Sequence, residues 1–375
     1  MPADVLVIGG GIIGTLTAIC LAEKGAGVRV VDGEMNAGTL TNAGSLHVQL
    51  QSRFMRLYPQ FVPALEAALP LYAAAAEAWI RLDQRLGPFE LVREGGLMVA
   101  EDEEQLDFLE DKANRETRMG LSVDILDRHA LERLAPWLAS RIIGAEICFN
   151  EGKVNPLVAN RRLRSHADRL GIDFVHDRID RVTEEGGRAV ATNRAGGRHT
   201  ADQVVVAASW DTGRIVRGLG VTIPTAPEPL HMNVTEAAAP QIRHLVQHAD
   251  RPITLKQLHS GQIVIGGGWP AEGRGPDTPP GIVAGSMLGN VALAAKMVPS
   301  VGKLRLLRSW TGVNTTIDGA SVIGHLPNAR RLIVAVPGDA GYTLAPLVAG
   351  MAASIALGET PPEDPRPFSP ARFAG

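Results

Sequence analysis

The stretch DVLVIGGGIIGTLTAICLAEKGAGVRVVDG, residues 4–33, decides the fold. An apolar run, a glycine-rich turn, a helical pattern and a second apolar run follow one another, which predicts a strand, a helix and a parallel strand in one βαβ unit. Gly9, Gly11 and Gly14 match the G-x-G-x-x-G pattern. The first glycine permits a sharp turn, the second leaves room for a pyrophosphate, and the third lets helix and strand pack closely. Asp32 ends the second run, where a carboxylate can accept hydrogen bonds from ribose hydroxyls. The sequence therefore predicts a dinucleotide site at a helix N-terminus.

The bulk composition is that of an ordinary globular protein. The 375 residues are 45% hydrophobic and 21% charged, enough for about two to three domain-sized cores. A net charge of -3 without a run of like charges does not indicate a nucleic-acid partner. We find no secretory leader pattern and no apolar stretch of about 18 residues, so no membrane span is expected. Cys20 and Cys148 are too few for a disulfide framework or a four-thiolate iron–sulfur cluster. These features suit a cytoplasmic protein, and no metal site is predicted.

Elements typical of the dinucleotide fold recur later in the chain. Residues 172–175 and 203–209 are predicted strands, with a hairpin through Val182 and Val190 between them. Residues 330–359 predict a last strand, a glycine turn and a long apolar helix. We therefore expect an α/β fold with a discontinuous Rossmann-like domain made of residues 1–50, 144–224 and 309–375. The intervening residues 51–143 and 225–308 predict helices beside a mostly antiparallel sheet, an α+β domain for substrate or subunit contacts.

Six motifs carry a resemblance to one known enzyme group. They are VIGGGIIG at 7–14, TNAGSLH at 41–47, GKVNP at 152–156, ADQVVVAAS at 201–209, SWTGVNTTIDGASVIG at 309–324 and VPGDAGYTLAP at 336–346. In this order they resemble the FAD-dependent D-amino-acid oxidase and glycine oxidase superfamily. Within it, NAGSLHVQL is most similar to the B (beta) chains of opine oxidases and opine dehydrogenases. The resemblance implies a glycine-oxidase-like fold with FAD bound non-covalently across the first sheet.

The resemblance also implies which residues meet FAD. The glycine turn would approach the pyrophosphate, the end of the second strand the adenosine ribose, and the TNAGSLH segment the phosphates and the flavin edge. Val182 would lie in the adenine pocket, and the last glycine loop would approach the isoalloxazine. The residues carried over in this way are Gly9, Gly11, Ile12, Ile13, Gly14, Asp32, Gly33, Thr41, Asn42, Ala43, Gly44, Ser45, Leu46, Val182, Ala208, Trp210, Gly338, Asp339, Gly341, Tyr342 and Thr343.

Three features depart from the pattern of the superfamily. Ser209 stands where a glycine is usual, and the loop PGDAGYT at 337–343 is shorter than its common form. Asn314 occupies the position at which glycine-oxidase-like members carry an arginine for the substrate carboxylate. Because a bidentate carboxylate partner is missing there, simple amino acids become less expected as substrates.

Polar side chains directly after the flavin motif are our candidates for substrate contacts. The residues from His47 to Arg53 alternate in a way that extended spacing would aim to one side. A solvated edge is the alternative for Arg53 and Arg56, a backbone-satisfied histidine for His47, and a surface strand lysine for Lys256. The full set is His47 and Tyr342 as catalytic candidates and Gln49, Gln51, Arg53, Asn314 and Lys256 as substrate-binding candidates.

The expected chemistry is FAD-dependent oxidation of a C–N bond. A hydride equivalent leaves the carbon next to nitrogen, and water hydrolyses the resulting imine to an amino acid and a 2-oxo acid. By resemblance, the substrate is an opine or related imino acid, and the chain is the FAD-bearing component of a multi-subunit dehydrogenase, with an FMN shared with a partner chain as a further option. Three alternatives stay open: a self-sufficient D-amino-acid, glycine or sarcosine-type oxidase that makes hydrogen peroxide, a non-catalytic flavin-binding scaffold, and a purely NAD-binding protein.

Overall fold

The first of two large sheets carries the predicted dinucleotide fold. The computed structural model describes residues 3–34, 38–338 and 340–374. The strands of this sheet are β1 (Ala3–Ile8), β2 (Val28–Asp32), β8 (Asp173–His176), β9 (Ile179–Glu185), β10 (Arg188–Asn193), β11 (Arg198–Val206), β17 (Val322–Leu326) and β18 (Ala329–Val336). They run in the order β17-β18-β11-β1-β2-β8, and the β9–β10 hairpin extends β11. The pairs from β8 to β18 are parallel, whereas β17 is antiparallel. The predicted Rossmann-like βαβ unit is therefore confirmed.

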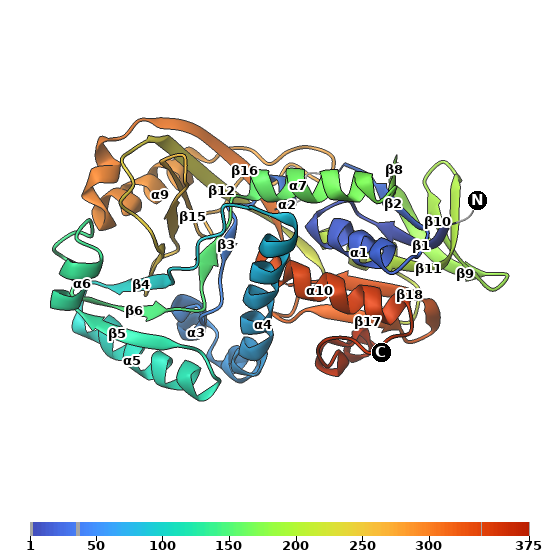
Figure 1. Ribbon diagram of the computed structural model, residues 1–375, viewed down its shortest axis with the longest axis horizontal. Coiled ribbons are helices and arrows are strands. Elements are labelled where there is room, and N and C mark those ends of the chain that lie inside the picture. The colour runs from blue at the N-terminus through green and yellow to red at the C-terminus, as the bar shows by residue number, and fades with distance from the viewer. Residues whose placement is uncertain (1–2, 35–37, 339, 375) are drawn as a thin grey trace.

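Alternating side chains of the first sheet enter two apolar cores. Val5 and Val7 of β1 face helices α1 (Ile12–Glu23) and α10 (Gly341–Ala356), whereas Leu6 and Ile8 face a core shared with the β9–β10 hairpin. Helix α7 (Pro156–Arg169) packs beside α1 (Figure 1). Each fully buried valine or leucine contributes about 1.5–3 kcal/mol. This burial on both faces holds the carboxyl ends of the parallel strands in a fixed row.

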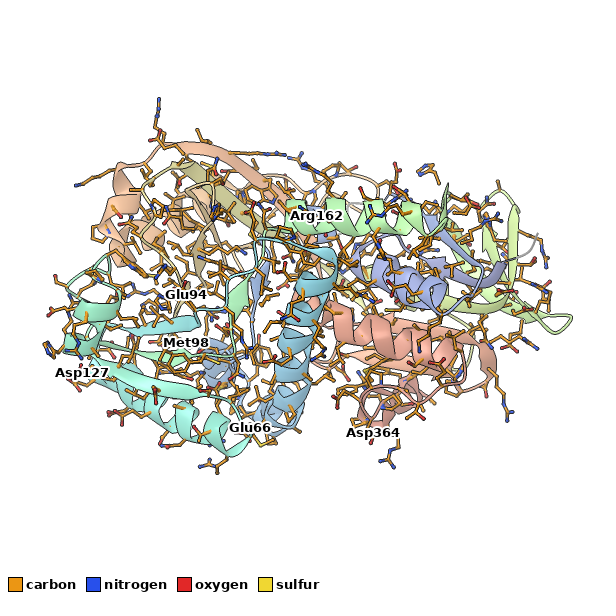
Figure 2. All side chains as sticks on the ribbon, viewed as in Figure 1. Glu66, Glu94, Met98, Asp127, Arg162 and Asp364 are labelled. Atoms are coloured by element: carbon orange, nitrogen blue, oxygen red, sulfur yellow. The ribbon has the colours of Figure 1, made fainter. Side chains whose placement is uncertain are left out.

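The second sheet is mostly antiparallel, as expected. Its strands are β4 (Gly96–Ala100), β5 (Val123–Asp127), β6 (Gly144–Cys148), β12 (Ala226–Ala237), β13 (Leu245–His248), β14 (Thr254–Gln257), β15 (Gln262–Gly266) and β16 (Leu306–Thr316). They run in the order β16-β12-β15-β14-β13-β4-β6-β5, and among the described pairs only β13–β4 is parallel. Leu97 and Val99 face helices α6 (Arg128–Leu134) and α9 (Ala284–Met297), while Met98, labelled in Figure 2, faces α5 (Glu103–Arg118).

The long helix α4 (Val62–Leu86) stands between the two sheets (Figure 1). Its Trp79 is buried in the core of the first sheet, and Leu69 packs in a separate apolar cluster with Val48. Glu66, near one end of α4 (Figure 2), accepts a hydrogen bond of 2.8 Å from Arg115 of α5. Helix α4 thus contacts both layers. The short elements are β3 (Ser45–Leu46), β7 (Gly152–Lys153), α2 (Gly38–Thr41), α3 (Ser52–Leu57), α8 (Thr212–Ile215) and 3-10 turns at Pro59–Phe61, Ser209–Asp211, Pro299–Lys303, Arg366–Phe368 and Pro370–Phe373.

Two strands belong to the second sheet, although most of their residues fall in ranges predicted for the FAD-binding domain. Strand β6 falls inside the predicted FAD-binding range that starts at 144, and most of β16 inside the range that starts at 309. In the structure β6 pairs with β4 and β5, and β16 pairs with β12. Pairing with distant strands decides the sheet to which each belongs, and an apolar run alone does not specify its partner. Among the described residues, no helix combines the length and apolar character needed to cross a membrane.

Candidate active site

A cavity of about 540 Å³ lies where the carboxyl ends of the first sheet meet the second sheet. Gly9, Asp32 and Ala207, at or just past the ends of β1, β2 and β11, line one side. Leu230 of β12 and Val313 of β16 line the other. Ligands of open α/β sheets bind beyond the carboxyl ends of the strands. The cavity therefore occupies the place that the glycine motif predicts for a dinucleotide.

The glycine turn has the shape required of a phosphate cradle. Gly9 has a φ of 105°, and a Cβ built there would overlap the carbonyl oxygen of Ala207. A Cβ on Gly14 would overlap the carbonyl oxygen of Gly9, so the close helix–strand packing needs glycine. Gly11 provides no side-chain cap for α1, and Thr39 Oγ1 accepts a hydrogen bond of 3.0 Å from Ile12 N. Gly11, Ile12 and Ile13 at the start of the helix line the cavity, and a helix N-terminus favours phosphates.

The residues predicted for the nucleotide half of FAD differ in whether they line the cavity. Asp32 and Gly33 line the cavity, as do Ala208 and Trp210. Val182 does not line it; this side chain is buried in the core beneath β9. Ile179, three residues earlier on the same strand, lines the cavity instead. The hairpin places its first residue at the cavity edge, and Val182 alternates into the core.

The TNAGSLH segment and the start of α10 are joined at the centre of the cavity. Thr343 Oγ1 accepts a hydrogen bond of 2.9 Å from His47 N and contacts Ser45 O at 3.5 Å. Trp79 Nε1 donates to the carbonyl oxygens of Tyr342 and Thr343, at 2.9 and 3.1 Å. Hydrogen bonds therefore connect the segment to the helix start, which α4 also contacts through Trp79.

Most of the predicted flavin-site residues in these two segments line the cavity. Those that do are Thr41, Asn42, Ala43, Ser45, Gly338, Gly341, Tyr342 and Thr343. Gly44 and Leu46 do not; Gly44, with a φ of 76°, packs against the carbonyl of Val154, and Leu46 is in the apolar core. Asp339 lies outside the described residues.

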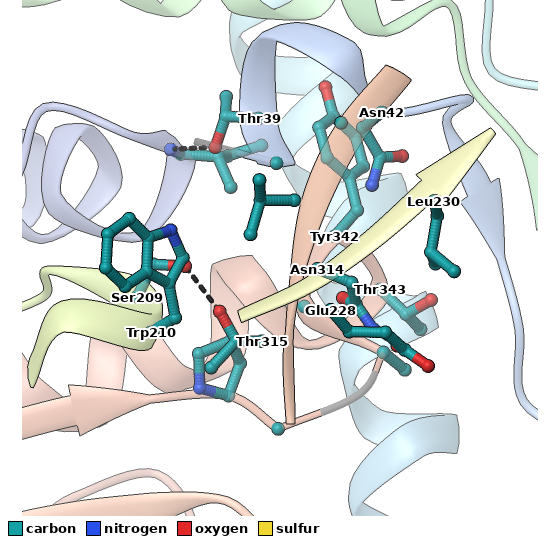
Figure 3. A pocket seen from close by; sticks show the side chains of 18 of the residues that line it. Thr39, Asn42, Ser209, Trp210, Glu228, Leu230, Asn314, Thr315, Tyr342 and Thr343 are labelled. Carbon is teal, nitrogen blue, oxygen red and sulfur yellow. Dashed lines mark hydrogen bonds between the residues drawn. The ribbon is translucent and has the colours of Figure 1, made fainter. Parts of the chain in front are cut away.

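Ser209 shows how the chain accommodates a departure from glycine. Its φ is 56°, the left-handed region that glycine adopts most readily. Its hydroxyl forms a hydrogen bond with Thr315 Oγ1 across the cavity wall (Figure 3). The glycine cradle, the helix start and the acceptor Asp32 together fit the pyrophosphate and ribose of FAD. In enzymes that bind FAD, the flavin supplies the acceptor for two electrons.

His47 lies against a fully buried carboxylate. Its Nδ1 is 3.8 Å from Glu151 Oε1 and has no hydrogen-bond partner. Glu151 Oε1 accepts from the backbone N–H groups of Val48 (2.8 Å) and Gln49 (3.2 Å). Its Oε2 accepts from the side-chain amides of Gln49 (2.8 Å) and Gln247 (2.9 Å). The buried carboxylate of Glu151 thus fixes the backbone that follows His47. It also offers the His47 ring a counter-charge.

Gln49 connects this carboxylate to a second buried cluster. Gln49 Oε1 accepts a hydrogen bond of 3.1 Å from Lys112 Nζ, which also lies 2.9 Å from Glu116 and 2.7 Å from Glu146. Burial lowers the pKa of Lys112, but the two carboxylates outweigh it and raise that pKa. Burial raises the pKa of Glu146 well above its usual value. Gln49 lines the cavity, yet its amide is fully engaged inside the protein.

The predicted polar ladder is wrong beyond Gln51. Helix α3 begins at Ser52, so Arg53 lies on a helix and not in extended chain. Gln51 and Arg53 both line the cavity, and both are exposed, as the solvated-edge alternative for Arg53 expects. Within the described ranges, no hydrogen bond or ion pair engages Arg53. Arg56 points elsewhere and lies 3.3 Å from Asp250.

Asn314 lines the cavity beside an acidic residue that the sequence did not single out. The antiparallel register of β12 and β16 sets Glu228 opposite Asn314. Asn314 Nδ2 donates a hydrogen bond of 3.0 Å to Glu228 Oε2 (Figure 3). At the position where an arginine was expected from the family pattern, this wall carries an amide and a carboxylate. Its charge is negative, whereas the family pattern places a positive charge there.

Lys256 and Tyr342 are both engaged within the protein. The surface-lysine alternative for Lys256 is wrong, because only 1% of the residue is exposed and its Nζ donates to Ser45 Oγ (3.3 Å). Burial and the nearby Lys153 lower the pKa of Lys256 well below its usual value. Lys256 is not among the residues that line the cavity. The Tyr342 hydroxyl donates to Asn160 Oδ1 (3.1 Å), and its ring stacks on Trp79 at 5.2 Å.

Comparisons with known proteins agree with this geometry. Residues 4–355 match the family model described as FAD dependent oxidoreductase (DAO). The beta chain of sarcosine oxidase from Rhizobium meliloti (strain 1021) is 24% identical over 86% of this chain and 77% of its own length. Glycine oxidase of Geobacillus kaustophilus (strain HTA426) is 25% identical over 99% and 97%, and the B component of opine oxidase from Rhizobium meliloti 24% over 85% and 84%. The solved structure of glycine oxidase from Geobacillus kaustophilus has a TM-score of 0.84 at 21% identity, covering 100% of both chains.

The family match spans nearly the whole chain, including both sheets and every segment that lines the cavity. FAD is the cofactor of this family, and the glycine cradle, Asp32 and the start of α10 line the cavity that would hold it. Two of the relatives are named for the oxidation of sarcosine and of glycine. The chain is therefore an FAD-dependent oxidoreductase of the DAO family.

Proposed function

We propose that the chain oxidises a secondary amine that carries carboxylates, namely an opine or a related imino acid. The observation that carries the proposal is Arg53, a guanidinium that lines the cavity and has no carboxylate partner in the described part of the chain. An exposed arginine without a partner, in a cavity that Gln51 and His47 also line, suits a carboxylate that arrives with the substrate. The similarity to the B component of opine oxidase supports the same class.

The reaction removes a hydride equivalent, which is two electrons and one proton, from the carbon next to nitrogen. The substrate leaves as an imine, and water adds to it to release an amino acid and a 2-oxo acid. The protein's own task is to hold that carbon, exclude water and accept the ammonium proton. His47 is our candidate for the proton, because its ring lies at the cavity with Glu151 Oε1 3.8 Å behind it. Tyr342 is a weaker candidate, since its hydroxyl donates to Asn160.

Substitution of Arg53 tests the proposal. Arg53→Met should weaken the binding of an opine, measured as Kd in anaerobic flavin reduction, by about 10- to 100-fold, the range of one charge-assisted carboxylate contact. Arg56→Met is the matched control on the same helix, because Arg56 is directed at Asp250 and does not line the cavity. Equal effects of the two substitutions would contradict a carboxylate site at Arg53.

We further propose that the chain is the FAD-bearing component of a larger dehydrogenase. Two relatives are named as parts of multi-chain enzymes, the beta chain of sarcosine oxidase and the B component of opine oxidase. This chain would then hold the FAD that accepts two electrons, and a partner chain would supply the next acceptor, such as a shared FMN. Co-purification of further redox proteins with a tagged chain supports this arrangement. Full dye-linked activity of the chain alone, with no partner retained, counts against it.

A self-sufficient oxidase of the glycine or sarcosine type is the second candidate. The glycine oxidase relative matches 99% of this chain, which favours a single-chain enzyme of that length. This candidate predicts hydrogen peroxide from glycine, sarcosine or D-amino acids by the isolated chain. Asn314, at the position of the family's carboxylate clamp, weighs against simple amino acids.

A further inference from the structure

We propose that Glu228 selects a substrate that carries a second cationic group in addition to its reacting nitrogen. The inference rests on the proposed function and names a narrower substrate class, an opine-type amine with an ammonium or guanidinium on its side chain. Glu228 lines the cavity from β12 and is half-buried.

The carboxylate of Glu228 has capacity left for a ligand. Oε2 accepts the amide of Asn314 at 3.0 Å, and this is the side-chain partner that the described part of the molecule provides. An ionised carboxylate offers about four acceptor positions. An arginine at position 314 would neutralise it, whereas asparagine donates a hydrogen bond and leaves the charge. A half-buried anion of this kind favours a cation in the cavity.

The other carboxylates that line the cavity have assigned partners. Asp211 binds Arg214 at 2.7 Å, and Asp177 binds His199 at 2.7 Å. Asp32 lies at the predicted ribose position. Of the acidic residues described along the cavity wall, this leaves Glu228 on the side formed by the second sheet.

Arg53 and Glu228 place one positive and one negative charge in the wall of the same cavity. Arg53 comes from α3, which follows the flavin segment, and Glu228 from β12 in the second sheet. Figure 3 shows Glu228 together with Asn314, apart from Trp210 at the nucleotide end. A ligand that pairs with both side chains carries a carboxylate and, at another position, a cation. An opine built on a basic amino acid has this distribution of charge, whereas one built on an apolar amino acid leaves Glu228 unpaired.

A pair of substrates that differ by one amino group tests the inference. We would mix the FAD-loaded chain anaerobically with N-(1-carboxyethyl)-lysine or N-(1-carboxyethyl)-norleucine of the same stereochemistry and measure flavin reduction as kred/Kd. The wild type should prefer the lysine compound by about 10- to 100-fold, the range of one charge-assisted contact. Glu228→Gln should bring the ratio close to one by slowing only the lysine compound. Glu236→Gln is the matched control, since Glu236 lies on the same strand, binds Arg305 and does not line the cavity.

The outcomes separate this inference from the proposed function. If both compounds reduce the flavin equally well in the wild type, only the inference about Glu228 fails. If Glu228→Gln keeps the preference, or slows both compounds alike, Glu228 does not read the side-chain cation. If neither compound reduces the flavin, the proposed function fails with it. The preference of the wild type for the lysine compound can be measured without any variant. Glu228→Lys, which should favour N-(1-carboxyethyl)-glutamate, provides a second test if Glu228→Gln loses FAD.

Discussion

Replacing Glu151 by glutamine should destabilise the protein, because every group that hydrogen-bonds to its carboxylate is an N–H donor. Oε1 accepts from Val48 N at 2.8 Å and Gln49 N at 3.2 Å. Oε2 accepts from Gln49 Nε2 at 2.8 Å and Gln247 Nε2 at 2.9 Å. A carboxamide keeps one acceptor oxygen and turns the other position into a donor. In Glu151→Gln the new side-chain NH2 group therefore faces N–H donors of its neighbours.

The two neighbouring glutamines decide the size of the effect. Gln247 can turn its amide by half a rotation, since its Oε1 is buried without a partner. Gln49 cannot, because its Oε1 accepts a hydrogen bond of 3.1 Å from Lys112. One donor–donor contact remains, which costs about 1.5–3 kcal/mol for the lost charge-assisted bond and about 1–3 kcal/mol for the unpaired donor. Burying an amide in place of a charge offsets part of this, so we expect a net loss of about 2–4 kcal/mol.

Urea unfolding of the FAD-saturated protein measures this loss. Glu132→Gln is the control, since Glu132 is exposed and its pair with Arg128 should contribute less than about 1 kcal/mol. In a Gln49→Leu background the donor–donor contact is gone, and Glu151→Gln should cost about 1–2 kcal/mol less. A Glu151→Gln protein within about 0.5 kcal/mol of the wild type would refute the buried-donor reasoning.

Three further predictions concern the flavin site and its supports. Gly14→Ala should weaken FAD binding at least about tenfold in apoprotein titration, because the new Cβ overlaps Gly9 O; Gly350→Ala, with open space around the added Cβ, should not. Trp79→Phe should cost about 1–3 kcal/mol in urea unfolding, since the two carbonyls at the start of α10 lose their donor. Burial lowers the pKa of Lys153 to about 8, so the unfolded chain binds the extra proton and stability should rise with pH between about 8 and 10.5. The full difference corresponds to about 3 kcal/mol; Lys153→Met should make that rise shallower, with the remainder due to Lys256, whose pKa burial also lowers, as urea midpoints across this pH range would reveal.

The nucleotide half of the site could be predicted because its rules are local. Gly9 and Gly14 follow from a turn and a close approach that only a few residues specify. Asp32 follows from its place at the end of the second strand. The left-handed backbone at Ser209 also follows the family's glycine, even though the residue differs.

The substrate half depends on strand pairing across long distances in the sequence. Glu228 and Asn314 meet only through the register of β12 and β16, and nothing within either segment announces the other. Glu151 stands just before GKVNP, a position that offered a weak signal for a residue close to the flavin segment. The sequence around Lys256 is that of a surface strand lysine, but the folded protein buries the residue. Period and composition do not determine such partners.

Anaerobic reduction of the bound flavin tests the central claim most directly. The FAD-loaded chain is mixed, without oxygen, with a panel of opines, D-amino acids, glycine, sarcosine and prolines, and the visible absorbance of oxidised flavin is followed. We expect carboxylate-bearing secondary amines to bleach the flavin fully and faster than glycine or D-amino acids, with an amino acid and a 2-oxo acid as products. A flavin that no opine or imino acid bleaches would contradict the claim, and fast bleaching by glycine alone would assign the chain to the simple amino-acid oxidases instead.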